Sequence, residues 1–230
     1  MSDEKELEVD SNDLRYTSLY GTENPYILKA FSVPPIMIFR YKDDVSDLKD
    51  VAFHLEAANP DQGLVQTQDT KVLHNVPEYK ELKEFIDKCI KHYVREVCGS
   101  HHEVEITQSW VNFLKENYGH PGHIHSNSYL SGVFYLNVDS ETGQPIEFER
   151  HDDYFPLKLG DEGIDNPQKH YNDIYPRLIC NAINGHLLLF PSTLKHSVSI
   201  NESSDARVSL SFNTFPKRPF GHGEVYGEVE

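Results

Sequence analysis

A succession of short strand-like segments fills the second half of the 230-residue chain, and this pattern constrains the fold more than any other. Each segment is rich in β-branched or aromatic residues and is bounded by turn residues, as antiparallel strands are. We expect strands at 104–114, 128–138, 145–149, 177–182, 186–190, 196–200 and 207–214. Helices ahead of such strands predict a mainly β fold with supporting α-helices, in which the helices back a sandwich or barrel.

The clearest helix is expected over 78–98. Its apolar residues recur every three or four positions and form one stripe along the helix axis. Pro77 suits the first helical turn, and Gly99 suits the position just after the helix. The stripe predicts a helix that covers a sheet. A shorter helix over 47–58 and a strand over 36–41 are expected ahead of it.

The length and composition favour a single domain. We expect an acidic, mobile tail over 1–15 and one domain over 16–230, with helices mainly at 47–98 and the β core at about 104–215. The segment 151–175 is long, polar and rich in Asp, Gly and Tyr. Loops of this length are often functional, so it is a candidate lid.

The acidic composition argues against two classes of partner. Lys plus Arg number 21 against 37 for Asp plus Glu, a net charge of −16, which disfavours general binding to nucleic acid or to anionic membranes. Three cysteines without disulfide or zinc spacing favour reduced thiols, and the N-terminal residues do not have the pattern of a signal peptide. We therefore expect a cytoplasmic protein, and the sequence carries no signal for its oligomeric state.

A cluster of histidines is the first candidate for chemistry. Alternate side chains of a strand share a face, so His123 and His125 are expected side by side with Ile124 behind them. His196 opens a later strand and is the best candidate for a third metal ligand. The competing interpretation is a chance H-x-H match in a chain with 13 histidines.

The segment 207–213 alternates strictly between polar and apolar residues. Arg207 opens its polar face, while the apolar face can pack beneath the helices. A guanidinium makes two parallel hydrogen bonds to a carboxylate, so this strand predicts a carboxylate receptor beside the metal ligand. The alternative is an ordinary half-exposed strand with a surface arginine. The segment 129–137 alternates too, and Tyr129 and Tyr135 on one face are candidates to help hold a bound acid.

These motifs together resemble one family. The stretch 109–215 resembles the 2-oxoglutarate/iron(II) oxygenases of marine bacteria and their phages, through the pieces SWVN (109–112), GHIHSNSYLSGVFYLNV (122–138), GHLLLFPSTLKHSV (185–198) and RVSLSFN (207–213). The resemblance implies a double-stranded β-helix, a cupin-like jelly roll with an open metal site. It also implies Fe(II), 2-oxoglutarate as cosubstrate, O2, and hydroxylation of a substrate coupled to decarboxylation of 2-oxoglutarate.

The resemblance also assigns roles to residues. His123 and His196 would be iron ligands, and Arg207 would bind the distal carboxylate of 2-oxoglutarate with help from Ser209. The side chains implied to line the same pocket are Asn112 and Tyr135.

One position departs from the family pattern. His125 stands where H-x-D/E…H enzymes carry a carboxylate, although three nitrogen ligands still suit iron, zinc, nickel or copper. Glu147 or Glu149 on the next strand is an alternative source of a carboxylate, ranked below His125. His120 is a candidate support for a ligand or a substrate contact, and exposure to solvent is the simpler expectation for it.

Two other functions compete with a 2-oxoglutarate-dependent enzyme. One is a three-histidine cupin-type dioxygenase that does not use 2-oxoglutarate. The other is a non-enzymatic jelly-roll module that binds sugar or protein. For the enzyme, the substrate class stays open between a prolyl or other peptidyl side chain, a free amino acid and a small metabolite.

Overall fold

The structure is a computed structural model that describes residues 17–18, 26–28, 35–139, 144–149 and 177–217. The expected tail over 1–15 and the candidate lid over 151–175 lie outside these residues. No helix in the described ranges is both long and apolar enough to cross a bilayer.

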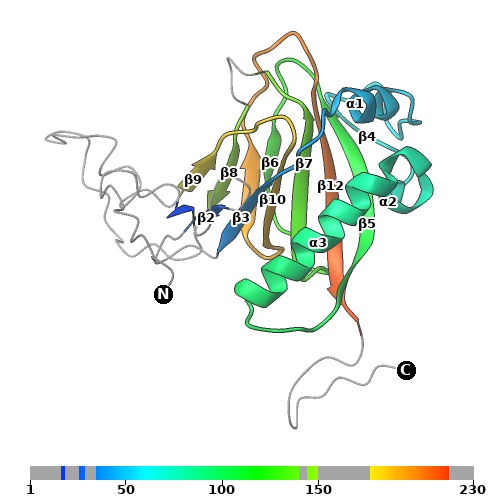
Figure 1. The fold of residues 1–230 in the computed structure, drawn as a ribbon. Coiled ribbons are helices and arrows are strands. Elements are labelled where there is room, and N and C mark those ends of the chain that lie inside the picture. Colours follow the sequence, from blue (N-terminus) through cyan, green and yellow to red (C-terminus); the bar gives the residue numbers. More distant parts are fainter. Residues whose placement is uncertain (1–16, 19–25, 29–34, 140–143, 150–176, 218–230) are drawn as a thin grey trace, which may run out of the picture.

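Two antiparallel sheets form the core of the molecule (Figure 1). The larger sheet has the order β1 (Thr17–Ser18), β2 (Tyr26–Leu28), β3 (Ile36–Arg40), β10 (His186–Pro191), β7 (Leu130–Asn137), β12 (Arg207–Pro216), β5 (Val104–Leu114) and β4 (Leu64–Gln66). The smaller sheet has the order β6 (His120–His123), β11 (Lys195–Val198), β8 (Ile146–Glu149) and β9 (Arg177–Cys180). This is the mainly β sandwich, with helices ahead of it, that the strand pattern predicts.

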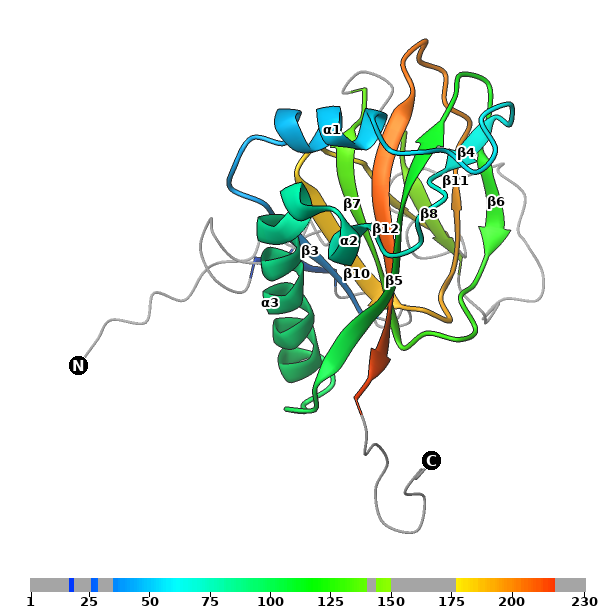
Figure 2. The ribbon, with the colours of Figure 1, turned by 90° about the vertical axis from the view of Figure 1, so that its right-hand side faces the viewer.

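The helices cover one face of the larger sheet, while β6, β8 and β11 lie on its other side (Figure 2). They are α1 (Ser46–Phe53), α2 (Val72–Asn75), the 3₁₀ helix η1 (Pro77–Tyr79) and α3 (Lys80–Glu96). The stripe of α3, including Leu82, Ile86 and Ile90, is buried in one cluster with Leu210 and Phe212 of β12. Each such side chain stabilises the fold by roughly 1.5–3 kcal/mol, so this contact anchors β12 from behind.

A second apolar cluster fills the space between the two sheets. Strand β10 serves both clusters, because Leu187 and Leu189 face the helices while Leu188 and Phe190 face the smaller sheet. All four side chains are at most 2% exposed, which explains why this strand is apolar without alternation. On the smaller sheet, Phe148 packs edge-on against Phe190, with ring centroids 4.9 Å apart.

Most expected elements are confirmed, with differences at their ends. The strand over 104–114 has the expected bounds, and Gly99 takes a positive φ of 61° after α3. Helix α1 ends earlier than expected because the chain after it runs beside β4, where the Ala58 amide donates to the Gln66 carbonyl. The short elements β4, α2 and β6 were not predicted. Strand β6 has the sequence HPGH, which carries no alternation of apolar residues.

Candidate metal and anion site

A pocket lies among strands of the two sheets, with walls from β5, β7 and β12 on one side and from β6 and β11 on the other. The ionisable side chains that line it are all bases: His120, His123, His125, His196 and Arg207. Among the described residues, no carboxylate lines this pocket. The pocket therefore suits a metal cation held by neutral imidazoles together with an anion held by the guanidinium.

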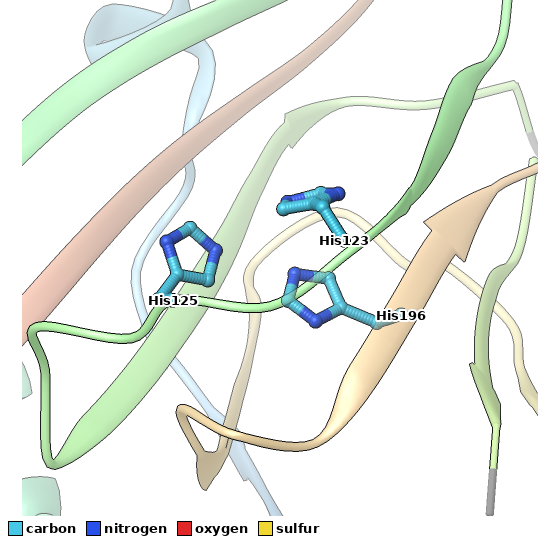
Figure 3. Close-up of side chains that lie close together, drawn as sticks. All are labelled: His123, His125 and His196. Atoms are coloured by element: carbon cyan, nitrogen blue, oxygen red, sulfur yellow. The ribbon is translucent and has the colours of Figure 1, made fainter.

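Three imidazoles converge in this pocket. One ring nitrogen from each of His123, His125 and His196 lies within 4.8 Å of the others, and their rings point toward one another (Figure 3). His123 and His196 are cross-strand partners on β6 and β11, with ring centroids 4.3 Å apart. Opposed positions on paired strands bring side chains together. Strand pairing alone therefore places these two rings.

His125 reaches the same place by another route. Strand β6 ends at His123, so the expectation that His123 and His125 share one strand is wrong. Ile124 is 47% exposed, and the His125 amide donates to the Ser192 carbonyl at 2.9 Å. The His125 ring then lies 5.1 Å from that of His123 and is stacked 5.2 Å from that of His196. The two histidines lie side by side as expected, but a loop contact rather than strand alternation places His125.

Hydrogen bonds orient the strand-borne rings. Nδ1 of His123 lies 2.9 Å from the Pro121 carbonyl oxygen, and Nδ1 of His196 lies 2.8 Å from the Leu194 carbonyl oxygen. A carbonyl only accepts, so both Nδ1 atoms carry the hydrogen and both Nε2 atoms keep a free lone pair. Metal-binding histidines commonly have this arrangement.

The buried rings are held in their neutral form. Burial lowers the pKa of His196 to about 3 and, aided by neighbouring imidazoles, lowers the pKa values of His120 and His125 to about 4. Since only a neutral imidazole binds a metal, these three residues are in the binding form at pH 7.

The alternative carboxylates face away from the pocket. On β8, Phe148 is the partner of His196 and points inward, so Glu147 and Glu149 point to the opposite side of the sheet. Glu147 accepts from Arg177 at 3.2 Å and Glu149 pairs with Lys195 at 2.6 Å. Neither glutamate belongs to the group of described side chains that could hold a metal. The alternative in which one of them replaces His125 is not supported.

Arg207 is a buried cation without an anionic partner among the described residues. It is 3% exposed, Nε donates to the Gln144 carbonyl at 3.3 Å, and Nη1 donates to Ser209 Oγ at 3.2 Å. Neither Nη2 nor the hydroxyl of the fully buried Tyr135 makes a hydrogen bond of normal geometry in the described structure, although burial raises the pKa of Tyr135 and the neighbouring Arg207 offsets part of that rise. The Arg207 Cζ atom lies 5.1 Å from the centre of the Tyr135 ring. Each buried donor left unpaired costs about 1–3 kcal/mol, so this corner suits an anionic acceptor.

Asn112 lines the pocket, but its polar atoms are already paired. Its Oδ1 accepts from Gln66 at 2.9 Å and from Trp110 at 3.0 Å, and its Nδ2 donates to Ser211 at 2.9 Å. In this structure it supports the pocket wall.

Three other residues depart from expectation. His120 lines the pocket with its ring 4.1 Å from that of His123, so the expectation of an exposed residue is wrong. Tyr129 lies outside β7, and its hydroxyl is 3.4 Å from Cys98 Sγ. Asn213 was not recognised as a neighbour of His125, and its position on the polar face of β12 was the only signal.

One family model matches part of the chain. The model of a family described as "Putative 2OG-Fe(II) oxygenase" matches residues 108–213, just under half of the chain. Among curated protein sequences, none matches.

Several solved structures share the fold at low identity. HygX from Streptomyces hygroscopicus, with nickel, 2-oxoglutarate and hygromycin B bound, is 13% identical with a TM-score of 0.56, over 82% of this chain and 85% of its own. An oxidoreductase of the 2OG-Fe(II) oxygenase family from Burkholderia pseudomallei is 13% identical with a TM-score of 0.51, over 74% and 76%. The non-heme alpha ketoglutarate dependent epimerase SnoN from nogalamycin biosynthesis is 15% identical with a TM-score of 0.55, over 80% and 79%.

These likenesses establish the jelly-roll fold. The family match spans β7, β8, β9, β10 and β11 and most of β5 and β12, and it includes His123, His125 and His196. Over residues 108–213, the chain therefore matches the family model described as a 2OG-Fe(II) oxygenase, and it shares the fold of solved members of that family.

Proposed function

We propose that the pocket is the active site of an iron(II)- and 2-oxoglutarate-dependent oxygenase, in which His123, His125 and His196 hold Fe(II). The observation that carries the proposal is the meeting of three convergent imidazoles and one buried guanidinium, whose Nη2 has no hydrogen-bond partner among the described residues, in a single pocket. Within the part of the chain that the structure describes, three candidate ligands converge, and such a set leaves coordination positions for a chelating cosubstrate and O2. Structural metal sites usually close all four positions with protein ligands.

In this proposal Arg207 binds the distal carboxylate of 2-oxoglutarate. Nη2 of Arg207 and the hydroxyl of Tyr135 are two buried donors on neighbouring side chains, and a carboxylate satisfies both. Ser209 holds the guanidinium through Nη1 and so fixes its direction. Asn112 contributes to the wall on which the cosubstrate lies.

Bound iron with 2-oxoglutarate supplies the oxidising chemistry: O2 is consumed, 2-oxoglutarate becomes succinate and CO2, and one oxygen atom enters the substrate as a hydroxyl group. The chain provides imidazole ligands, a cationic anchor and an apolar enclosure. Phe190, Val133 and Ile146 line the pocket and exclude water from the reacting groups.

The substrate is proposed to be a small molecule or a peptidyl side chain. Trp110 lines the pocket with its ring 6.1 Å from that of His125, so an aromatic surface lies close to the proposed metal. We further propose that residues 16–230 act as one oxygenase domain. The three cysteines are free in the structure, which fits the expected cytoplasmic location.

A second candidate is a three-histidine dioxygenase that does not use 2-oxoglutarate. One observation favours it: among the described residues, the group of side chains that could hold a metal consists of three histidines and contains no carboxylate. The unpaired Arg207 favours the first proposal, because an enzyme without the keto acid needs no buried carboxylate anchor. A binding module without a metal would not require three histidines that converge in one pocket.

Calorimetric titration separates these candidates. The protein is loaded with Ni²⁺, which nitrogen ligands bind and which does not oxidise in air, and 2-oxoglutarate is then added. The proposal predicts binding that is much stronger with the metal than without it. Ni²⁺ binding without any response to 2-oxoglutarate would favour the second candidate, and absence of Ni²⁺ binding would contradict both enzymes.

A further inference from the structure

The Nδ1 atom of His125 lies next to the side-chain amide of Asn213, whereas the Nδ1 atoms of His123 and His196 lie next to backbone carbonyls. Asn213 is 7% exposed on β12, and its Nδ2 atom is placed 3.3 Å from Nδ1 of His125. Its Oδ1 atom is placed 2.8 Å from the hydroxyl of Ser131. Unlike a carbonyl, an amide can present either a donor or an acceptor to the ring.

The direction of this amide decides where His125 keeps its hydrogen. If the NH2 group faces the ring, Nδ1 must accept, so the hydrogen of the neutral ring sits on Nε2 and blocks that nitrogen. If the amide oxygen faces the ring, Nδ1 carries the hydrogen and Nε2 keeps its lone pair. The two orientations differ by a half-turn of the amide, which the positions of the heavy atoms barely distinguish.

A chain of serine hydroxyls discriminates between the orientations, beginning at Ser128. Its Oγ lies 2.9 Å from the Leu130 carbonyl oxygen and 3.1 Å from the Thr214 carbonyl oxygen. Both carbonyls can only accept, so the single hydroxyl hydrogen of Ser128 is directed to one of them and not to Ser192. The hydroxyl of Ser192, 2.7 Å from Ser128 Oγ, must therefore be the donor in that contact.

The same counting continues to Asn213. Since Ser192 donates to Ser128, the contact of 2.9 Å between Ser131 and Ser192 requires Ser131 to donate. The one hydrogen of Ser131 is then used, and the amide group 2.8 Å from it must be the donor. The NH2 group of Asn213 therefore faces Ser131, and its oxygen faces His125. This orientation requires the amide of Gln108, placed 3.3 Å from the same end of the Asn213 amide, to turn its NH2 group toward that oxygen.

We propose that Asn213 is a positioning residue that accepts a hydrogen bond from Nδ1 of His125 and so turns a free Nε2 toward the metal. The inference rests on the proposed function, in which His125 is a ligand. It gives all three rings one arrangement, with Nδ1–H donating to an oxygen, although His125 lies outside a strand.

Nitrogen NMR of the histidine rings in the metal-free protein at neutral pH tests the assignment directly. The proposal predicts that His125 carries its hydrogen on Nδ1 in the wild type. It predicts the same form in Asn213→Asp, because a carboxylate can only accept. If the wild type has the hydrogen on Nε2 and Asn213→Asp moves it to Nδ1, the amide faces the other way and the proposal is overturned.

Ni²⁺ titration gives a second readout. Loss of a ligand's hydrogen-bond partner typically weakens metal binding about 10- to 100-fold, which we expect for Asn213→Ala, with binding largely retained in Asn213→Asp. Asn137→Ala is the matched control, because that amide donates to the Ala206 carbonyl and does not line the pocket. Unchanged Ni²⁺ affinity in Asn213→Ala, with circular dichroism of a folded protein, would overturn the proposal.

The two readouts separate this inference from the proposed function. A wild type with Nδ1–H on His125 that fails to bind Ni²⁺ would contradict the metal site and leave the hydrogen-bond assignment standing. A wild type that binds Ni²⁺ through His125, yet keeps the hydrogen on Nε2 when metal-free, would contradict the role of Asn213 alone.

Discussion

The strand-borne histidines and the loop-borne histidine of this pocket are held by different means. His123 and His196 are register partners on paired strands, and each Nδ1 meets a backbone carbonyl two residues earlier. His125 depends on one backbone contact with Ser192 and one side-chain contact with Asn213. Strand pairing therefore fixes the first pair, whereas the third ring also depends on a side chain, Asn213, that a single substitution can remove.

The largest effect is expected from removing a strand-borne ring. His196→Ala leaves two imidazoles, one of them on a loop, so we expect iron content to fall to background and activity to be abolished. Metal analysis after anaerobic loading measures this. His186→Ala is the matched control, because His186 lies half-buried on a strand but does not line the pocket. Normal turnover in His196→Ala would disprove the assignment of this ligand.

The next largest effect is expected at the loop-borne ring. In His125→Ala the strand pair persists, so we expect weaker iron binding than in the wild type but more than in His196→Ala. His125→Asp places a carboxylate at the position where most iron/2-oxoglutarate enzymes carry one, and we expect it to restore binding. Equal iron affinity in the wild type and His125→Ala would mean that His125 is not a ligand.

A smaller effect, confined to the cosubstrate, is expected from Arg207→Gln. A hydrogen bond to a charged group contributes about 1.5–3 kcal/mol, which corresponds to roughly 10- to 100-fold weaker binding of 2-oxoglutarate. Calorimetry on the metal-loaded protein measures it, and Arg177→Gln, a surface substitution of the same kind, serves as control. Comparable weakening in both variants would show that overall charge, and not the pocket, governs the affinity.

The smallest effect is expected on the outer face of the smaller sheet. Glu149→Gln removes an ion pair with Lys195, whose side chain is 45% exposed. We therefore expect the free energy of unfolding to fall by at most about 1 kcal/mol. Iron affinity should not change. A loss of iron comparable to that of His125→Ala would revive the idea that a carboxylate of β8 completes the site.

Sequence periodicity was sufficient wherever a local rule decides the structure. The alternation over 207–213 correctly put Leu210 and Phe212 against the helices and Arg207 toward the pocket. The three- and four-residue spacing of α3 likewise predicted its buried stripe. Both predictions depend only on which way neighbouring side chains point.

The rest depends on contacts between distant segments. His125 is placed by Ser192, far along the chain, and nothing in H-x-H indicates where a strand ends. The direction of Glu147 and Glu149 follows from the pairing of β8 with β11, in which Phe148 opposes His196. That register was not available from either segment alone.

The most direct test of the central claim is the visible spectrum of the protein loaded anaerobically with Fe(II) and then with 2-oxoglutarate. A weak metal-to-ligand charge-transfer band arises when the keto acid chelates iron in the protein. The account predicts this band in the wild type and its loss in His123→Ala and His196→Ala. Iron bound by the three histidines without any such band would contradict the claim that this pocket joins a metal site to a 2-oxoglutarate site.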